Sequence, residues 1–337
     1  EVKELHLSFT LNNREVRVLR GVQFEVNEGE TVALVGESGC GKSLTARAIM
    51  GILPHIPHKI KGGSIAYKGR DLLKLPPREM ERVRGKEIAM IFQDPMTSLN
   101  PTMKVGWQIA EGVMKHEGIR GKQALERAIE LLKMCGIPEA ETRAGQYPHE
   151  FSGGMRQRAM IAMALSCSPR LLIADEPTTA LDVTIQAQII ELLKKIQQDT
   201  GTSILLITHD LGVVASLSDR VVVMYAGEIV EAGKAGEIFY APRHPYTKGL
   251  IRSVPRVDQI KGGWVDAFPG SPPDLSQLPK GCVFASRCAD AMEKCYRQAP
   301  ILRGEGKGHV SACWVHTALQ SQGNQGVVYR VRGKSHG

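Results

Sequence analysis

The chain has 337 residues, of which 42% are hydrophobic and 23% are charged, proportions typical of a globular protein with a large buried core. No window approaches the roughly eighteen consecutive apolar residues of a membrane-spanning helix, because charges interrupt runs such as RLLIADEP. The net charge of +8 is compatible with an anionic partner, but Lys and Arg are scattered and no aromatic residues alternate with them. We therefore do not expect nucleic acid as a partner.

The first residues, EVKELHLSFT, lack a basic segment followed by an apolar stretch, so we expect a cytoplasmic protein. Thiols are kept reduced in that compartment, which disfavours disulfides among the seven cysteines. Metal binding becomes the leading interpretation of any cysteine cluster.

Residues 30–53, ETVALVGESGCGKSLTARAIMGIL, predict a strand, a Gly-rich turn and a helix. Residues 36–43 match the phosphate-binding pattern G-x-x-x-x-G-K-S in that context, where backbone N–H groups bind phosphate oxygens. Lys42 would bridge the β- and γ-phosphates and Ser43 would bind Mg²⁺, although a Gly-rich turn can also have no ligand. The Cys40 thiol is either reactive or a small filler of the loop. The expected nucleotide-binding residues are Gly36, Ser38, Gly39, Cys40, Gly41, Lys42, Ser43 and Leu44.

Apolar runs of strand length recur in EIAMIFQD, RLLIADEP, TSILLITHD and RVVVMYAG, which predicts an α/β fold with a mostly parallel, doubly covered sheet. Polar side chains follow three of these runs: Gln93, Asp175 with Glu176, and His209. The carboxyl ends of adjacent parallel strands converge on a ligand crevice. Asp175 would hold Mg²⁺ and Glu176 would orient or deprotonate the attacking water, although either carboxylate could instead cap a helix or form an ion pair.

Helical spacing dominates between FQDP and FSGG, most clearly in KQALERAIELLKMCGI, so we expect a helical insertion at about residues 95–160. A second amphipathic helix is predicted in the segment VTIQAQIIELLKKIQQDTG, ending before Gly201. Ser152, Gly153 and Gly154 at a helix N-terminus could form a second anion-binding element or a simple helix cap.

The composition changes after about residue 240 to Pro-, Gly- and Ser-rich segments. This change predicts a small loop-rich domain to about residue 320 and a basic tail over 321–337. Four of the seven cysteines lie here, separated by five, six and seventeen residues: Cys282, Cys288, Cys295 and Cys313. These spacings are not those of common zinc modules, and from the residues alone an iron–sulfur cluster and zinc both stay open.

The ordered motifs resemble the ATP-binding subunits of ABC transporters over residues 1 to about 240. GESGCGKS resembles Walker A, Gln93 the Q-loop, FSGGMRQR the signature, LLIADE Walker B, Asp182 the D-loop and His209 the switch histidine. The resemblance implies a P-loop ATPase core with a helical subdomain that binds ATP and Mg²⁺, with Gln93, Glu176 and His209 as catalytic residues and Gln93 also near Mg²⁺. It further implies an ATP sandwich in which Ser152, Gly153, Gly154 and Asp182 face a nucleotide shared with a second subunit.

Two positions depart from the family pattern or fit it loosely. Phe151 and Met155 replace the usual Leu and Gln of the signature. Phe9 matches the family's adenine-stacking aromatic residue, but a core role fits it nearly as well.

APRHPYTKGL followed by PGSPPDL and the four cysteines resembles the ATPase subunits of bacterial dipeptide and oligopeptide importers. This resemblance implies a [4Fe–4S] cluster on Cys282, Cys288, Cys295 and Cys313, with Zn²⁺ as the alternative. It also implies a second, different ATP-binding subunit, two permease subunits, an extracytoplasmic peptide-binding protein, and a peripheral location on the cytoplasmic face of the membrane.

Two other functions are less consistent with the sequence. A soluble ABC-type ATPase acting on ribosomes or DNA would commonly have two cassettes or a long coiled coil, and this chain shows one cassette without heptads. An iron–sulfur sensor that binds ATP without hydrolysing it is disfavoured because both Glu176 and His209 are present.

Overall fold

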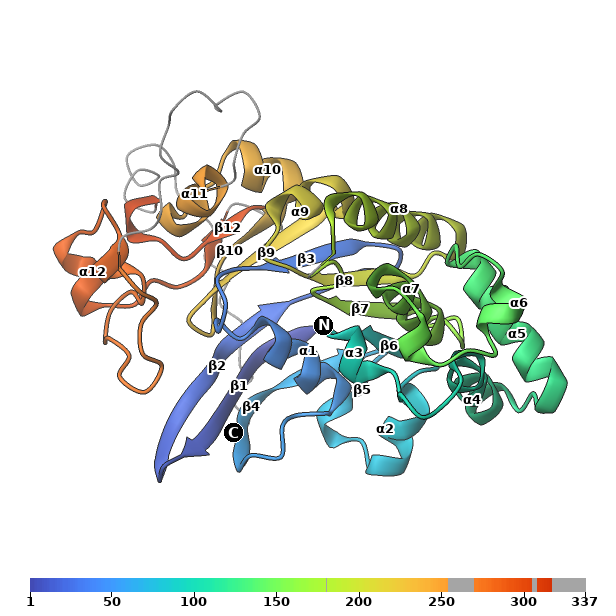
Figure 1. The fold of residues 1–337 in the computed structure, drawn as a ribbon. Coiled ribbons are helices and arrows are strands. Elements are labelled where there is room, and N and C mark those ends of the chain that lie inside the picture. Colours follow the sequence, from blue (N-terminus) through green and yellow to red (C-terminus); the bar gives the residue numbers. More distant parts are fainter. Residues whose placement is uncertain (180, 254–269, 305–307, 317–337) are drawn as a thin grey trace.

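The computed structural model describes residues 1–179, 181–253, 270–304 and 308–316 (Figure 1). The predicted basic tail lies outside these residues. Within them, no helix is both long enough and apolar enough to span a bilayer.

The main sheet has eight strands in the order β11-β12-β10-β9-β3-β8-β7-β6. Five neighbouring strands are parallel, as the apolar runs predict: β9 (Arg220–Tyr225), β3 (Thr31–Val35), β8 (Ser203–Ile207), β7 (Leu171–Asp175) and β6 (Ile88–Ile91). The other three strands are antiparallel to their neighbours: β10 (Glu228–Lys234), β12 (Val310–Ser311) and β11 (Arg303–Gly304). Because β12 pairs with β10, the C-terminal region extends the same sheet.

Two layers cover the parallel strands (Figure 1). On one side lie α1 (Lys42–Met50) and a second, antiparallel sheet in the order β2-β1-β4-β5. That sheet consists of β1 (Val2–Leu11), β2 (Arg14–Phe24), β4 (His58–Tyr67) and β5 (Arg70–Asp71), followed by η1 (Leu72–Lys74) and α2 (Pro77–Val83). On the other side lie α7 (Gly153–Ala164), α8 (Val183–Thr200) and α9 (Leu211–Leu217). Each layer has its own buried apolar cluster, which confirms the doubly covered sheet.

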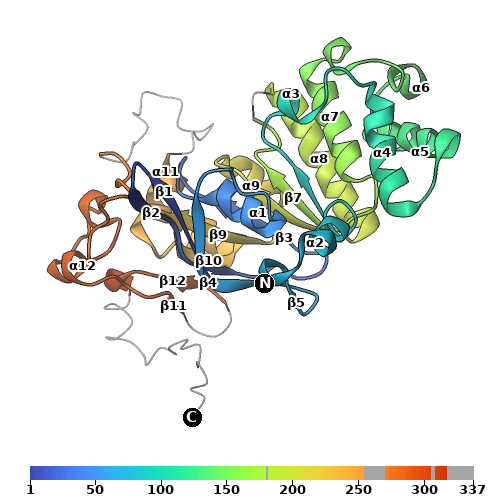
Figure 2. The ribbon, with the colours of Figure 1, turned by 90° about the horizontal axis from the view of Figure 1, so that it is seen from below.

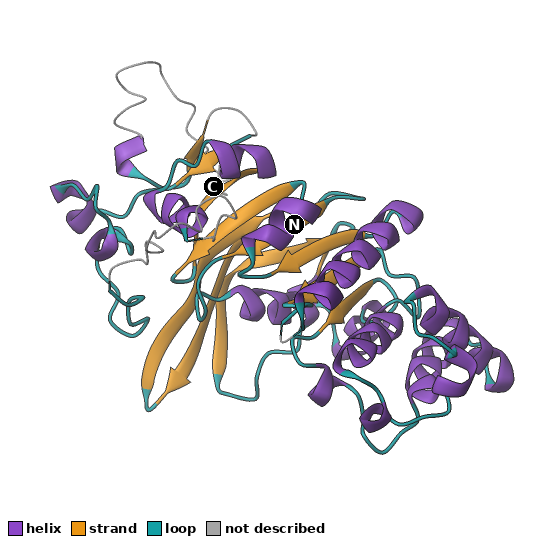
Figure 3. Ribbon diagram, turned by 45° about the horizontal axis from the view of Figure 1, so that its top comes forward, coloured by secondary structure: helices purple, strands orange, loops and turns teal. Residues whose placement is uncertain are grey.

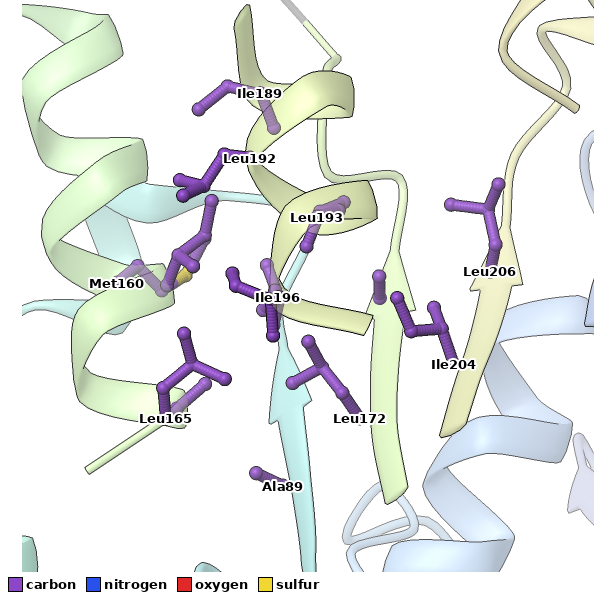
Figure 4. Packing of buried hydrophobic residues seen from close by; sticks show 14 of the residues in the cluster. Ala89, Met160, Leu165, Leu172, Ile189, Leu192, Leu193, Ile196, Ile204 and Leu206 are labelled. Atoms are coloured by element: carbon purple, nitrogen blue, oxygen red, sulfur yellow. The ribbon is translucent and has the colours of Figure 1, made fainter. Parts of the chain in front are cut away.

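The apolar face of helix α8 that the sequence pattern predicts is the face that is buried. Its buried residues Ile189, Leu192, Leu193 and Ile196 face strands β7 and β8 and helix α7 (Figure 4). The helix begins where the Asp182 carboxylate accepts a hydrogen bond from Ile185 N (2.9 Å) and ends before Gly201, whose φ of 66° is left-handed.

Residues 95–164 form a group of helices beside the strands, seen from below in Figure 2. The group contains α3 (Pro95–Ser98), α4 (Val105–Glu117), α5 (Gly121–Met134), α6 (Ala140–Arg143), η2 (Pro148–Glu150) and α7. Figure 3 shows this group at the opposite end of the molecule from the C-terminal region. Helix α10 (Ala235–Tyr240) precedes that region, which contains α11 (Pro245–Arg252), η4 (Ala285–Arg287) and α12 (Glu293–Arg297).

Candidate nucleotide-binding site

The phosphate loop connects β3 to α1 in a conformation that depends on glycine. Gly36 has φ 152° and Gly41 has φ 109°, both unfavourable for other residues. A Cβ atom on Gly36 would lie 2.1 Å from the carbonyl oxygen of Met224, so the loop also packs closely against β9. The sequence therefore fixes the loop shape that exposes backbone N–H groups to an anion.

Lys42 is the first residue of α1, and its side chain is buried under the loop. Its Nζ donates to the carbonyl oxygens of Gly36 (2.7 Å) and Glu37 (3.0 Å). The ammonium group therefore lies at the helix N-terminus, where positive charge and backbone N–H groups combine to bind phosphate.

Ser43 and Asp175 are brought together from distant parts of the chain. Ser43 Oγ donates to Asp175 Oδ1 at 2.8 Å, and the Asp175 side chain ends strand β7 with only 2% of the residue exposed. Burial raises the pKa of Asp175, and the neighbouring Glu176 adds to this effect while the Ser43 hydroxyl opposes it. A buried carboxylate beside a hydroxyl is a donor set that suits Mg²⁺, whose charge would lower the pKa again.

Glu176 follows Asp175 and holds a strained backbone with φ 51°. Its N–H donates to the carbonyl of Ile207 (2.8 Å), which ties it to the end of strand β8. Glu176 Oε1 lies 2.8 Å from His209 Nδ1, and Oε2 accepts a hydrogen bond from Thr179 Oγ1 at 2.9 Å. The carboxylate is thus fixed on both oxygens at the end of the parallel sheet.

Sequence reasoning missed Thr179, because it follows no strand and matches none of the motifs used. Gln93 lies exposed after β6, the strand that pairs with β7, so it is at the same edge as Asp175. The structure thus gathers Ser43, Asp175, Glu176, His209 and Gln93 at the carboxyl ends of neighbouring strands.

The signature residues lie on the helical side of the molecule. Ser152 Oγ accepts from Met155 N (3.3 Å) and caps α7, and a Cβ on Gly153 would meet nothing within 4 Å. The N-terminus of α7 is therefore both capped and open to approach. Phe151 is buried in the core and Met155 packs against it, so these two departures from the family pattern contribute to core packing at the start of α7.

Phe9 is buried in the apolar cluster beneath α1, with its ring edge-on to His58 at a centroid distance of 5.9 Å. Of its two possible roles, burial favours the core role, and adenine stacking stays a prediction. Burial raises the pKa of the Cys40 thiol, so the filler role is favoured over a reactive thiolate.

All seven cysteines are free thiols, and four of them gather in the C-terminal region. Cys282 N donates to the carbonyl of Cys295 at 2.7 Å, which joins the two stretches of chain that carry these cysteines. Burial raises the pKa of Cys282 to about 11, and the other three thiols contribute to the shift, which places Cys288, Cys295 and Cys313 in its vicinity. Among the residues described, no group of three or more His, Cys, Asp or Glu is arranged so that it could hold a metal ion.

A phosphate loop with a Ser–Asp pair and a Glu–His pair at the ends of parallel strands defines an ATP-hydrolysing cassette. Comparison with known proteins agrees: residues 19–179 match the family model "ABC transporter" and residues 230–295 match "Oligopeptide/dipeptide transporter, C-terminal region". The chain resembles the solved dimeric structure of MJ0796, a bacterial ABC transporter cassette, with a TM-score of 0.63 and 28% identity over 69% of this chain and 97% of that one.

Curated relatives match almost the whole chain. The oligopeptide transport ATP-binding protein OppD of Bacillus subtilis is 56% identical over 315 residues, 94% of this chain and 88% of the relative. The dipeptide transport ATP-binding protein DppD of the same organism is 53% identical over 93% of both chains, and Salmonella typhimurium OppD is 51% identical over 93% and 92%. The chain therefore belongs to the ABC transporter ATPases, in the group of oligopeptide and dipeptide transport ATP-binding proteins.

Proposed function

We propose that this chain hydrolyses ATP to drive import of dipeptides or oligopeptides across a bacterial membrane. The observation that carries the ATPase part is the fixed Glu176 carboxylate beside the Ser43–Asp175 pair. The peptide part is supported by relatives named as oligopeptide and dipeptide transport proteins, which match more than nine-tenths of the chain, and by the match of residues 230–295 to the C-terminal region of such transporters. This C-terminal match also disfavours an ATPase that acts on ribosomes or DNA.

The residues present suggest how hydrolysis proceeds. The loop N–H groups and Lys42 bind the β- and γ-phosphates, and Ser43, Asp175 and Gln93 would hold Mg²⁺, which neutralises phosphate charge. Glu176 accepts a proton from the attacking water, and His209 and Thr179 keep its carboxylate in place.

We further propose that the chain works in an ATP sandwich with a second, different ATP-binding subunit. The N-terminus of α7, which is open at Gly153, would face the γ-phosphate held by the partner with Ser152, Gly153 and Gly154, and Asp182 would lie nearby. The solved cassette named above is dimeric. In this proposal residues 1–240 form the nucleotide-binding domain, and the helices at about 95–160 dock on one of two permease subunits at the cytoplasmic face. An extracytoplasmic binding protein would deliver the peptide.

A peptide-uptake assay tests this function. In cells whose own copy of the gene is deleted, wild-type chain should restore ATP-dependent uptake of a labelled dipeptide or tetrapeptide, and Glu176→Gln should not. A control, Glu87→Gln, alters a carboxylate at the amino end of β6 that accepts from Lys68 and Tyr67, and should restore uptake. Equal uptake with and without the wild-type chain would refute peptide import.

For the C-terminal region we propose a [4Fe–4S] cluster on Cys282, Cys288, Cys295 and Cys313, with Zn²⁺ as the alternative. Each thiolate of such a cluster binds a different iron, so its ligands are spread more widely than those of one ion. The proposal is supported by four free thiols in one region, of which three contribute to the raised pKa of the fourth, Cys282.

Iron, sulfide and zinc analysis of anaerobically purified protein tests the cluster. About four irons and four sulfides per chain are expected, with a large loss in Cys288→Ser. Cys167→Ser, at a buried thiol that contacts Gly112, is the matched control and should retain them. One zinc without sulfide would establish the alternative.

A further inference from the structure

The C-terminal region makes hydrogen bonds to Glu37 of the phosphate loop, a residue at a variable position of the loop motif. The Glu37 N–H donates to the Tyr246 hydroxyl at 2.7 Å. Its carboxylate pairs with both terminal nitrogens of Arg287, with Nη1 to Oε2 at 2.7 Å and Nη2 to Oε1 at 2.9 Å. Two C-terminal residues therefore hold the backbone and the side chain of one loop residue.

Arg287 is itself firmly placed. Its side chain is only 5% exposed, and Nη1 also donates to the Tyr225 hydroxyl at 3.2 Å. The guanidinium lies over the rings of Tyr225 (5.8 Å) and Phe284 (5.9 Å). These two rings pack edge to face at 5.3 Å, and Tyr246 completes a buried aromatic group with them. A bidentate arginine on a rigid support fixes its carboxylate partner in both position and orientation.

The Glu37 carboxylate belongs to the loop whose N–H groups and lysine attract phosphate. The Glu37 carbonyl also accepts from Lys42 Nζ at 3.0 Å, so a shift of this residue would reach the phosphate-binding lysine. An unpaired carboxylate here would repel the phosphates, because like charges disfavour each other in a partly buried site. Pairing with Arg287 removes that repulsion.

We propose that Arg287 is a positioning residue for ATP binding, which neutralises Glu37 and holds the phosphate loop in its anion-binding shape. It acts through Glu37 and Tyr225 and is not a catalytic residue. The proposal goes beyond peptide import and beyond the cluster, because it concerns nucleotide binding by this chain alone and needs neither cargo nor cluster.

The backbone also connects this residue to the cysteines. Arg287 N donates to the Phe284 carbonyl (3.0 Å) and Cys288 N donates to the Ala285 carbonyl (3.3 Å), so one tight turn presents both side chains. This turn therefore carries Arg287, which pairs with Glu37 of the phosphate loop, and next to it Cys288, one of the four C-terminal cysteines.

The test measures the dissociation constant of a fluorescent ATP analogue with Mg²⁺ on the full chain. Arg287→Ala should raise this dissociation constant on the order of 2- to 30-fold, the range for residues that act through a neighbour. In Arg287→Ala with Glu37→Gln the affinity should recover most of this loss, because no unpaired carboxylate remains. Arg220→Ala breaks the Arg220–Glu30 pair (3.3 Å) at the amino end of β9 and should leave affinity unchanged.

The rescue separates positioning from a purely structural role. Loss of aromatic packing alone would not be relieved by a change at Glu37, so absence of rescue overturns the proposal. Affinity of Arg287→Ala within twofold of wild type also overturns it. If that variant does not fold, Arg287→Gln keeps the stem over Tyr225 and replaces it in the same comparison, where wild-type affinity again overturns the proposal.

Discussion

Replacing Glu176 by Gln isolates the proposed base from the geometry around it. In the structure Oε2 accepts from Thr179 Oγ1 (2.9 Å) and Oε1 lies 2.8 Å from His209 Nδ1. A glutamine can satisfy both neighbours, because its oxygen accepts from Thr179 and its amide group donates to a neutral Nδ1. Size and contacts are kept, so the variant loses only the ability to take a proton.

A positioned general base contributes about 10²- to 10⁴-fold to rate, which is about 3–5 kcal/mol of activation free energy. We expect Glu176→Gln to lower ATP turnover by that factor while the dissociation constant for ATP stays within about threefold, since no phosphate-loop contact changes. Phosphate release and binding of a fluorescent ATP analogue measure the two quantities, with Glu87→Gln as control. Undiminished hydrolysis in Glu176→Gln would refute the role assigned to this carboxylate.

Three further predictions follow from other contacts. Lys42→Ala should weaken ATP binding by about 10- to 100-fold, the range for hydrogen bonds to charged groups, and undiminished binding in a titration would contradict the phosphate-loop interpretation. Burial lowers the pKa of His244 from 6.5 to about 4. Between these two pH values His244 is protonated in the unfolded chain and neutral in the folded chain, so the protein becomes less stable as the pH falls below 6.5. In urea unfolding, His244 should lower the free energy of unfolding by about 2 kcal/mol between pH 7.5 and 5. The variant His244→Asn keeps an acceptor for Tyr246 N and should not show this decrease. An equal decrease in wild type and variant would rule out His244 as its source. If the four cysteines hold a cluster, its removal by chelation should weaken ATP binding in wild type but change little in Arg287→Ala, and equal weakening in both would argue against a link through Arg287.

The sequence predicted those parts of the site that depend on local patterns. The loop from Gly36 to Ser43 needs glycines at fixed positions, and the polar residues at strand ends follow from the parallel sheet. Helix α8 was predicted to end before Gly201 and does so, because a glycine can take the left-handed conformation that ends a helix.

The contacts that the sequence could not predict join residues far apart in the chain. Arg287 and Glu37 are 250 positions apart, and His309 and Glu231 are 78 apart. No periodicity or motif spacing predicts these contacts, because they depend on how β12 and η4 pack on the sheet. Phe9 illustrates the same limit, since only the packed structure shows its ring buried in the core.

The C-terminal region is bound to the ATPase core at a second point besides the phosphate loop. Glu231 on β10 is fully buried, and Oε1 lies 2.5 Å from His309 Nε2. Burial raises its pKa, but hydrogen bonds from His309 and from the backbone N–H groups of Arg243 and His244 together hold the pKa below its usual value.

A buried carboxylate of this kind is stable only with its partners, because an unpaired buried charge costs several kcal/mol. The Glu231 carboxylate in β10 therefore stays charged only while the C-terminal region supplies its partners. The charge of Glu37 in the phosphate loop is likewise neutralised by a residue of that region. In both contacts, a carboxylate of the ATPase core, Glu231 or Glu37, is stabilised by residues beyond 240. The cysteine-bearing region accordingly acts as a structural part of the ATP-binding unit, and changes in its packing reach the nucleotide through the loop that binds the phosphates.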